Sequence, residues 1–281
     1  MAKKLLFLPI IVLFLLIISF ETQADVLVDD ADSTNVLGQG FTLETVPTGS
    51  GQEGDYVIFA CGVTTDNGNS FDAPFPGTWT EFDDGICDSP DGNCFQGIWG
   101  SFVDNPASAD ITCEWNIPTS VFVGGSFRYN QVDPDDPIID SACDSGADFG
   151  PNIMATAPSI VTEAGSQVVR IYTYRNFDSA GSGNTNANND TSGSFSADST
   201  QDTFSNVHMR GTTDLVPVDG PTGTASVDAG FDAEWRACTI ALRMVPDPRM
   251  VPTMSEWGML AFATFAGIAG FWFIRRRQLA A

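Results

Sequence analysis

The sequence has very few basic residues outside its two ends. Both lysines lie within the first five residues, and three of the ten arginines stand together near the C-terminus. Residues 25–250 therefore keep seven arginines and no lysine, and only Glu21 and Glu256 of the 36 acidic residues lie outside that stretch, so its formal charge is 7 − 34, about −27. Because such a surface repels phosphate groups, we exclude nucleic acid and anionic lipid headgroups as primary partners.

The sequence also lacks the residues of common catalytic groups. His208 is the only histidine, and no GxSxG motif accompanies it, so a Ser-His-Asp arrangement is not supported. The abundance of carboxylates makes any glycosidase-like pair uninformative. We predict a protein that is not an enzyme, and a secreted hydrolase remains an alternative that a carboxylate pair in a deep cleft would support.

A long amphipathic helical pattern is absent between Asp25 and Met250. Apolar and polar residues instead alternate, as at Ile111, Cys113 and Trp115, between turns rich in Gly, Asn, Asp and Pro. This pattern predicts an all-β antiparallel β-sandwich, with a jelly roll as one connectivity that it allows. The expected strands are 54–65, 77–82, 95–103, 109–116, 121–132, 159–174, 206–211 and 236–245.

Stretches rich in turn-forming residues also divide the chain into segments. A Pro- and Asp-rich loop is expected between residues 132 and 159, and the Ser- and Asn-rich stretch Phe177–Thr203 indicates a long exposed loop. Pro246–Met250 resembles a linker in composition. The last expected strand ends just before this linker, so we predict one domain over residues 25–245.

Six cysteines lie between the two ends, and an even number in an exported chain indicates up to three disulfides. Cys87 and Cys94 bracket a turn-forming stretch and are expected to pair, while a Cys61–Cys238 bond would join an early strand to the last one. Zinc is the rival interpretation, but the cysteines do not form paired CxxC motifs. The candidates are Cys61, Cys87, Cys94, Cys113, Cys143 and Cys238.

The N-terminus has the organisation of a signal peptide. Lys3 and Lys4 precede an uncharged apolar run over Leu5–Phe20, and small residues follow at the positions that a signal peptidase requires. We predict cleavage after Ala24, which makes residues 1–24 a signal peptide. An uncleaved anchor is the alternative, for which the run is somewhat short.

The C-terminus combines a short polar motif, an apolar span and a basic stop. The span Met259–Ile274 is uncharged and is followed by Arg275, Arg276 and Arg277, which are expected to stay cytoplasmic. That orientation places residues 25–245 outside the cytoplasm. A buried core helix is the alternative, but the apolar residues cover every face of the predicted helix.

The polar motif consists of Val251, Pro252, Thr253, Met254, Ser255, Glu256, Trp257 and Gly258, and the apolar span and the three arginines follow it. With this order of parts, residues 251–281 resemble the IPTL-CTERM family of protein-sorting domains. The resemblance covers only this tail, and Val251 and Met254 replace the family's namesake Ile and Leu. It implies recognition by an exosortase-type transpeptidase in a Gram-negative bacterium, with the chain as its substrate, after which the protein reaches the cell surface or extracellular matrix.

Calcium is the best cofactor candidate, because acidic and amide side chains on turns supply the oxygen ligands that it prefers. Asp133, Asp135 and Asp136 are the first choice among these turns. The same residues also serve turn geometry without any metal. Further candidate loops contain Asp66, Asn67 and Asn69; Asp83 and Asp84; and Asp88, Asp91 and Asn93.

Tryptophans offer a second binding chemistry, because indole rings stack on sugars. Trp79, Trp99, Trp115 and Trp235 are candidates, although Trp115 alternates in phase with expected core residues.

The leading interpretation is a non-enzymatic structural or adhesive surface protein. The alternative is a module that binds calcium or a surface glycan through the same fold.

Overall fold

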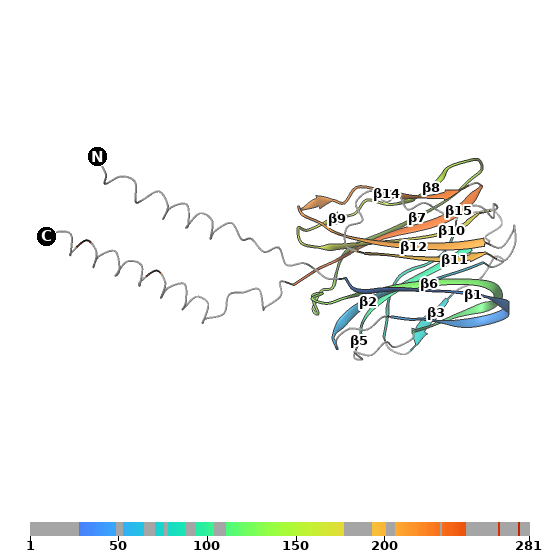
Figure 1. The fold of residues 1–281 in the computed structure, drawn as a ribbon, viewed down its shortest axis with the longest axis horizontal. Coiled ribbons are helices and arrows are strands. Elements are labelled where there is room, and N and C mark those ends of the chain that lie inside the picture. The colour runs from blue at the N-terminus through green and yellow to red at the C-terminus, as the bar shows by residue number, and fades with distance from the viewer. Residues whose placement is uncertain are drawn as a thin grey trace. The chain divides into compact units, whose positions relative to one another are not determined.

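The computed structural model describes residues 28–48, 53–64, 71–75, 78–87, 94–103, 111–176, 193–200, 206–230 and 232–245, together with Thr264 and Arg275. Its elements between Val28 and Val245 are β-strands in antiparallel sheets, which confirms the all-β prediction. Val26–Val245 forms one compact unit (Figure 1).

The first sheet is built from the first six strands. Their order is β1-β6-β2-β5-β4, and β3 pairs with β6. Strand β2 lies between β6 and β5 and is buried on both faces, which explains its near-continuous apolar sequence. The strands are β1 (Val28–Val46), β2 (Asp55–Thr64), β3 (Phe71–Phe75), β4 (Thr80–Ile86), β5 (Cys94–Val103) and β6 (Ile111–Tyr129).

The long β1–β6 ribbon is interrupted by register shifts between Leu37 and Leu43. Beyond the shifts, Val46 pairs with Ile111, and both pack with Phe59 and Trp99 in a core on the face of β2 that points away from the second sheet. The Cys61–Cys113 disulfide ties β2 to β6 inside this core. The bend of the ribbon thus gives the first sheet a second, aromatic-rich core.

The second sheet uses the later strands in the order β11-β12-β10-β15-β7. Its central strand β10 pairs in continuous register with β12 on one side and β15 on the other. The strands are β7 (Ile138–Asp148), β10 (Gln167–Asn176), β11 (Gly193–Thr200), β12 (Asn206–Leu215) and β15 (Ala233–Leu242).

The two sheets share one apolar core. Ile58 and Phe127 from the first sheet pack with Ile171, Met209 and others from the second. The outer face of the second sheet is covered in turn by two small sheets, as Figure 1 shows for β8, β14 and β9. Their strands are β8 (Ile153–Ala157), β9 (Val161–Thr162), β13 (Gly220–Pro221) and β14 (Ala225–Gly230).

Several sequence predictions of loops were wrong. Ile138–Asp148 and Ile153–Ala157 are strands inside the expected Pro- and Asp-rich loop, and Gly193–Thr200 is a strand inside the expected loop Phe177–Thr203. Strand β1 was not predicted either. The described strands also do not alternate between the two main sheets, so the connectivity differs from that of a jelly roll.

Candidate functional site

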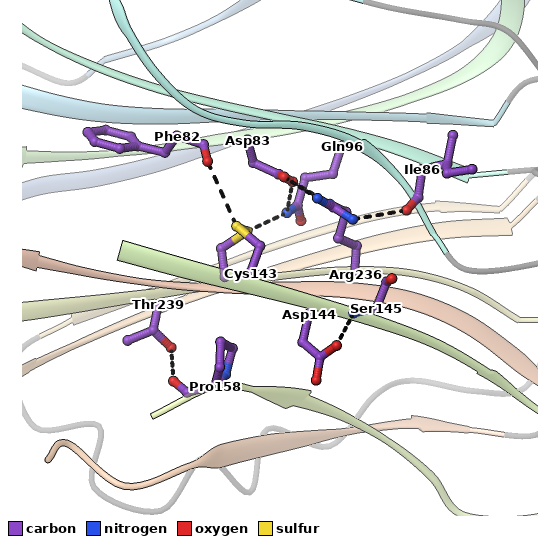
Figure 2. Close-up of a disulfide and its surroundings, with 11 residues drawn as sticks. Phe82, Asp83, Ile86, Gln96, Cys143, Asp144, Ser145, Pro158, Arg236 and Thr239 are labelled. Carbon is purple, nitrogen blue, oxygen red and sulfur yellow. Dashed lines mark hydrogen bonds and ion pairs between the residues drawn. A yellow bond between two sulfur atoms is a disulfide. The ribbon is translucent and has the colours of Figure 1, made fainter. Parts of the chain in front are cut away.

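The best-defined polar group in the described residues lies between the two sheets. Asp83 on β4 accepts two hydrogen bonds from Arg236 on β15: Nε lies 2.6 Å from Oδ2, and Nη2 lies 2.5 Å from Oδ1. Gln96 on β5 donates its Nε2 to Asp83 Oδ2 at 3.0 Å. We call Asp83, Gln96, Arg236 and the adjacent Cys143–Cys238 disulfide the inter-sheet clasp (Figure 2).

A β-bulge aims Asp83 into the protein. Glu81 pairs with Trp99 and Asp83 pairs with Ile98, so Phe82 is the extra residue of the bulged strand. Phe82 packs against the shared core, and the Asp83 side chain is only 3% exposed. The register shift therefore lets two successive residues of an edge strand face inward.

The disulfide closes the opposite side of the clasp. Cys143 and Cys238 are direct partners in the β7–β15 register, and Cys238 Sγ lies 3.3 Å from Gln96 Nε2. Cys143 Sγ also lies 3.9 Å from the Phe82 carbonyl oxygen, as a contact and not as a hydrogen bond, because a disulfide sulfur carries no proton. The clasp thus joins edge strands β4 and β7 to central strands of both sheets.

The electrostatics of the clasp favour a permanent ion pair. The hydrogen bonds that Arg236 donates to Asp83 raise the pKa of the guanidinium, against the lowering effect of its burial. Neighbouring Asp84 differs, because partial burial raises the pKa of its carboxyl, while the amide of Phe71, which donates to it at 3.3 Å, lowers it. Asp83 and Asp84 therefore belong to different environments, although the sequence analysis grouped them in one calcium loop.

The clasp does not have the chemistry of a metal site. Asp83, Cys143 and Cys238 form the one group of three metal-ligand residues found close together among the described residues. The two sulfurs are joined in a disulfide and are not thiolates, and both oxygens of Asp83 accept from Arg236. What this arrangement does is hold the two sheets together.

The cysteines pair as Cys61–Cys113, Cys87–Cys94 and Cys143–Cys238, and no free cysteine remains. The Cys87–Cys94 prediction is confirmed, and this pairing leaves no thiolate for zinc. The Cys61–Cys238 prediction was wrong. Cys238 faces the core shared by the sheets, whereas Cys61 points to the opposite face of β2, so the first sheet separates the two sulfurs.

The preferred calcium residues lie in the turn before β7. Asp133 Oδ1 accepts the backbone amide of Asp135 at 2.9 Å, and Asp136 pairs with Arg243. The carboxylate oxygens of Asp133, Asp135 and Asp136 do not lie close enough together to hold one metal ion. Asp136 already has a counter-ion, so calcium binding at Asp133, Asp135 and Asp136 stays a prediction for titration. The loops with Asp66 to Asn69 and Asp88 to Asn93 lie outside the described residues.

The four candidate tryptophans, all among the described residues, do not form an exposed platform. Trp99, Trp115 and Trp235 are buried, and Trp79 is half-buried with its ring centroid 5.6 Å from that of Phe59. These side chains therefore contribute to the core, as the alternation around Trp115 suggested. His208 is also buried and stacks on Tyr174, so it faces no open cleft.

The targeting segments fall largely outside the described residues. Ala24, the motif Val251–Gly258, Arg276 and Arg277 are among those left out, as is the linker, while Arg275 and Thr264 occupy helical positions. Within the described part of the chain, no helix has both the length and the apolar character needed to span a membrane.

Sequence reasoning did not identify the clasp. Asp83 was considered only as a member of a candidate calcium loop, and Gln96 and Arg236 belonged to no recognised motif. The one available signal was an arginine at the start of the mostly apolar expected strand 236–245 in a strongly acidic chain. No protein-family model, no curated protein and no solved structure matches the chain.

Proposed function

We propose that this chain is an exported envelope or surface protein with a non-catalytic structural or adhesive β-sandwich as its body. The observation that carries the proposal is the complete pairing of all six cysteines. Disulfides persist in oxidising compartments outside the cytoplasm, so three of them in a single compact unit support export.

The polar interior of the body supports a mechanical role over a catalytic one. Within the described residues, the ion pairs Arg128–Asp55, Arg175–Glu234 and Arg236–Asp83 each join two different strands. The single histidine is buried. These side chains brace the sheets from within, which suits a module that must remain folded on a surface.

Delivery of this body is the second part of the proposal. An N-terminal signal peptide, residues 1–24, starts export, and the tail from Val251 holds the precursor in the inner membrane as a transmembrane helix. An exosortase-type transpeptidase then cuts near the sorting motif, and the body passes to the cell surface or matrix. The support for this step is the order of motif, apolar span and arginines in the sequence.

Intact-mass spectrometry of the protein from its native host, before and after reduction and alkylation, tests both parts. We expect a chain that begins near Asp25, ends near Val251–Thr253 and gains six alkyl groups only after reduction. A mass that retains the arginine tail would reject processing and leave a membrane-anchored protein. Alkylation without reduction would reject the disulfide-stabilised body.

Substitutions in the tail separate sorting from simple anchoring. Pro252→Ala combined with Trp257→Ala should trap the precursor in the inner membrane, while Pro246→Ala in the linker should not. If fractionation places the double variant where the wild type goes, the motif has no sorting role.

A further inference from the structure

Arg170 is a buried arginine that no carboxylate of the described residues neutralises. Four described arginines form ion pairs, namely Arg128 with Asp55, Arg175 with Glu234, Arg236 with Asp83 and Arg243 with Asp136. Arg170 is 6% exposed, and within the described part of the chain no acidic oxygen lies within ion-pair distance of it. In a body with an excess of acids, a buried and unpaired guanidinium requires an explanation, since burial of an isolated charge is costly.

The hydrogen bonding of Arg170 is incomplete as well. Within the described residues, its one side-chain hydrogen bond is a long one of 3.5 Å from Nη2 to the carbonyl oxygen of Thr222, and its Nε has no partner. An unsatisfied donor on a charged group loses the full solvation of that group without compensation.

A second unsatisfied donor stands directly beside it. Arg170 pairs with Thr212 on β12, so the two side chains share the outer face of the second sheet. Thr212 is completely buried, and its Oγ1 has no partner. On the other side of Arg170, the Thr239 hydroxyl donates to the Pro158 carbonyl oxygen at 2.6 Å, so its proton is already engaged in a hydrogen bond. One positive N–H donor and one hydroxyl donor thus lie together without an acceptor.

We propose that Arg170 and Thr212 bind a small oxyanion, of the sulfate or carboxylate class. A planar guanidinium matches the oxygens of such ions, and the neighbouring hydroxyl supplies a further donor. The segments around Thr222 and Pro158 lie over the site and leave Arg170 almost covered, so the ligand is a small free ion and not a polymer. On the same face of β12, Asp214 lies opposite Val168 in the register, and no ion pair joins it to Arg170.

Thermal unfolding of the exported protein, with its disulfides intact, tests the site. Sodium sulfate and sodium acetate are titrated against sodium chloride at equal ionic strength, which separates site binding from screening. We expect a saturable rise in Tm with an oxyanion in the wild type, and no saturable component in Arg170→Met. The control Arg243→Gln removes a partly exposed arginine and should respond like the wild type. Parallel curves for wild type and Arg170→Met would overturn the proposal.

Equilibrium dialysis with radiolabelled sulfate covers the case in which Arg170→Met does not fold. The wild type should bind one sulfate per chain, Arg170→Lys should bind at least tenfold more weakly because it lacks the planar fork, and Thr212→Val should also weaken binding. Sulfate retention no higher than for a denatured control would overturn the site. Equal competition by chloride would overturn the assignment to oxyanions.

Discussion

At the scale of single residues, the two members of the clasp's ion pair differ in access to water. The Asp83 side chain is 3% exposed and that of Arg236 is 20% exposed. Loss of either partner leaves the other without its counter-ion, but the guanidinium can turn toward solvent and the carboxylate cannot. The penalty for breaking the pair should therefore depend on which residue is removed.

We expect Arg236→Met to lower the free energy of unfolding by about 3 kcal/mol, because it leaves the buried Asp83 carboxylate without a counter-ion. Asp83→Asn should cost about half as much, since Gln96 and Arg236 can still bond to the amide or to water. Urea unfolding of both variants and of Asp83→Leu/Arg236→Met measures the asymmetry. Equal losses in the two single variants would show that water reaches both groups alike.

The contribution of Asp84 to the free energy of unfolding should depend on pH. Burial raises its pKa in the folded state, so the protonated form is favoured there. Its stabilising contribution is present below its unfolded pKa of about 3.9 and is lost as the pH rises through the folded value. Asp84→Asn should therefore raise the free energy of unfolding at pH 7, by less than about 0.5 kcal/mol given its exposure, and should not raise it at pH 3. A gain that persists unchanged at pH 3 would assign the effect to something other than ionisation.

At the scale of elements, the three disulfides close loops of very different length. Cys87 and Cys94 are seven residues apart, and Cys143 and Cys238 are 95 apart. In the chain-entropy description, the longer loop restricts the unfolded chain more.

Replacing Cys143 and Cys238 by alanine should cost about 4.7 kcal/mol, against about 2.4 kcal/mol for Cys87 and Cys94. Guanidinium unfolding of the two double variants compares them directly. A larger loss for the short loop would mean that local geometry, and not loop entropy, sets their contribution.

On the edge strand β7, two backbone N–H groups donate hydrogen bonds to aspartate side chains of the same strand. Ser141 N donates to Asp140 Oδ1, and Ser145 N donates to Asp144 Oδ1, each at 2.9 Å. Charges on an edge strand oppose pairing with another chain. Asp140→Ala/Asp144→Ala should therefore increase concentration-dependent self-association in analytical ultracentrifugation, whereas Asp148→Ala at the strand end should have less effect. A monomeric double variant would contradict this role.

At the scale of the whole molecule, an excess of negative charge destabilises the compact state by self-repulsion. Raising the ionic strength from about 0.01 M to about 0.5 M shortens the screening length from about 30 Å to about 4 Å, so Tm should rise with sodium chloride.

Calcium should raise Tm further than magnesium does at equal ionic strength only if the Asp133–Asp136 turn binds calcium. Asp133→Asn should then abolish that excess and Asp148→Asn should not.

Local sequence patterns predicted the strands with apolar sequences but not those defined by their partners. Strands β2, β5 and β15 carry the apolar and β-branched residues of central positions, and all were expected. Strand β7 is rich in Asp, Ser and Gly, and it is extended because β15 supplies its hydrogen bonds. The same explanation holds for β11 beside β12, since edge strands need little apolar surface of their own.

What the sequence determined by itself is short-range: the all-β class, the Cys87–Cys94 bond across a turn, and the acidity of the body. Periodicity, turn residues and charge act over a few positions and can be counted along the chain. Only the tertiary structure decided that Cys61 bonds to Cys113, that Arg236 meets Asp83, and that Arg170 is buried without a carboxylate. Those relations join residues up to 153 positions apart, and they depend on which face of each strand a bulge or a sheet order presents.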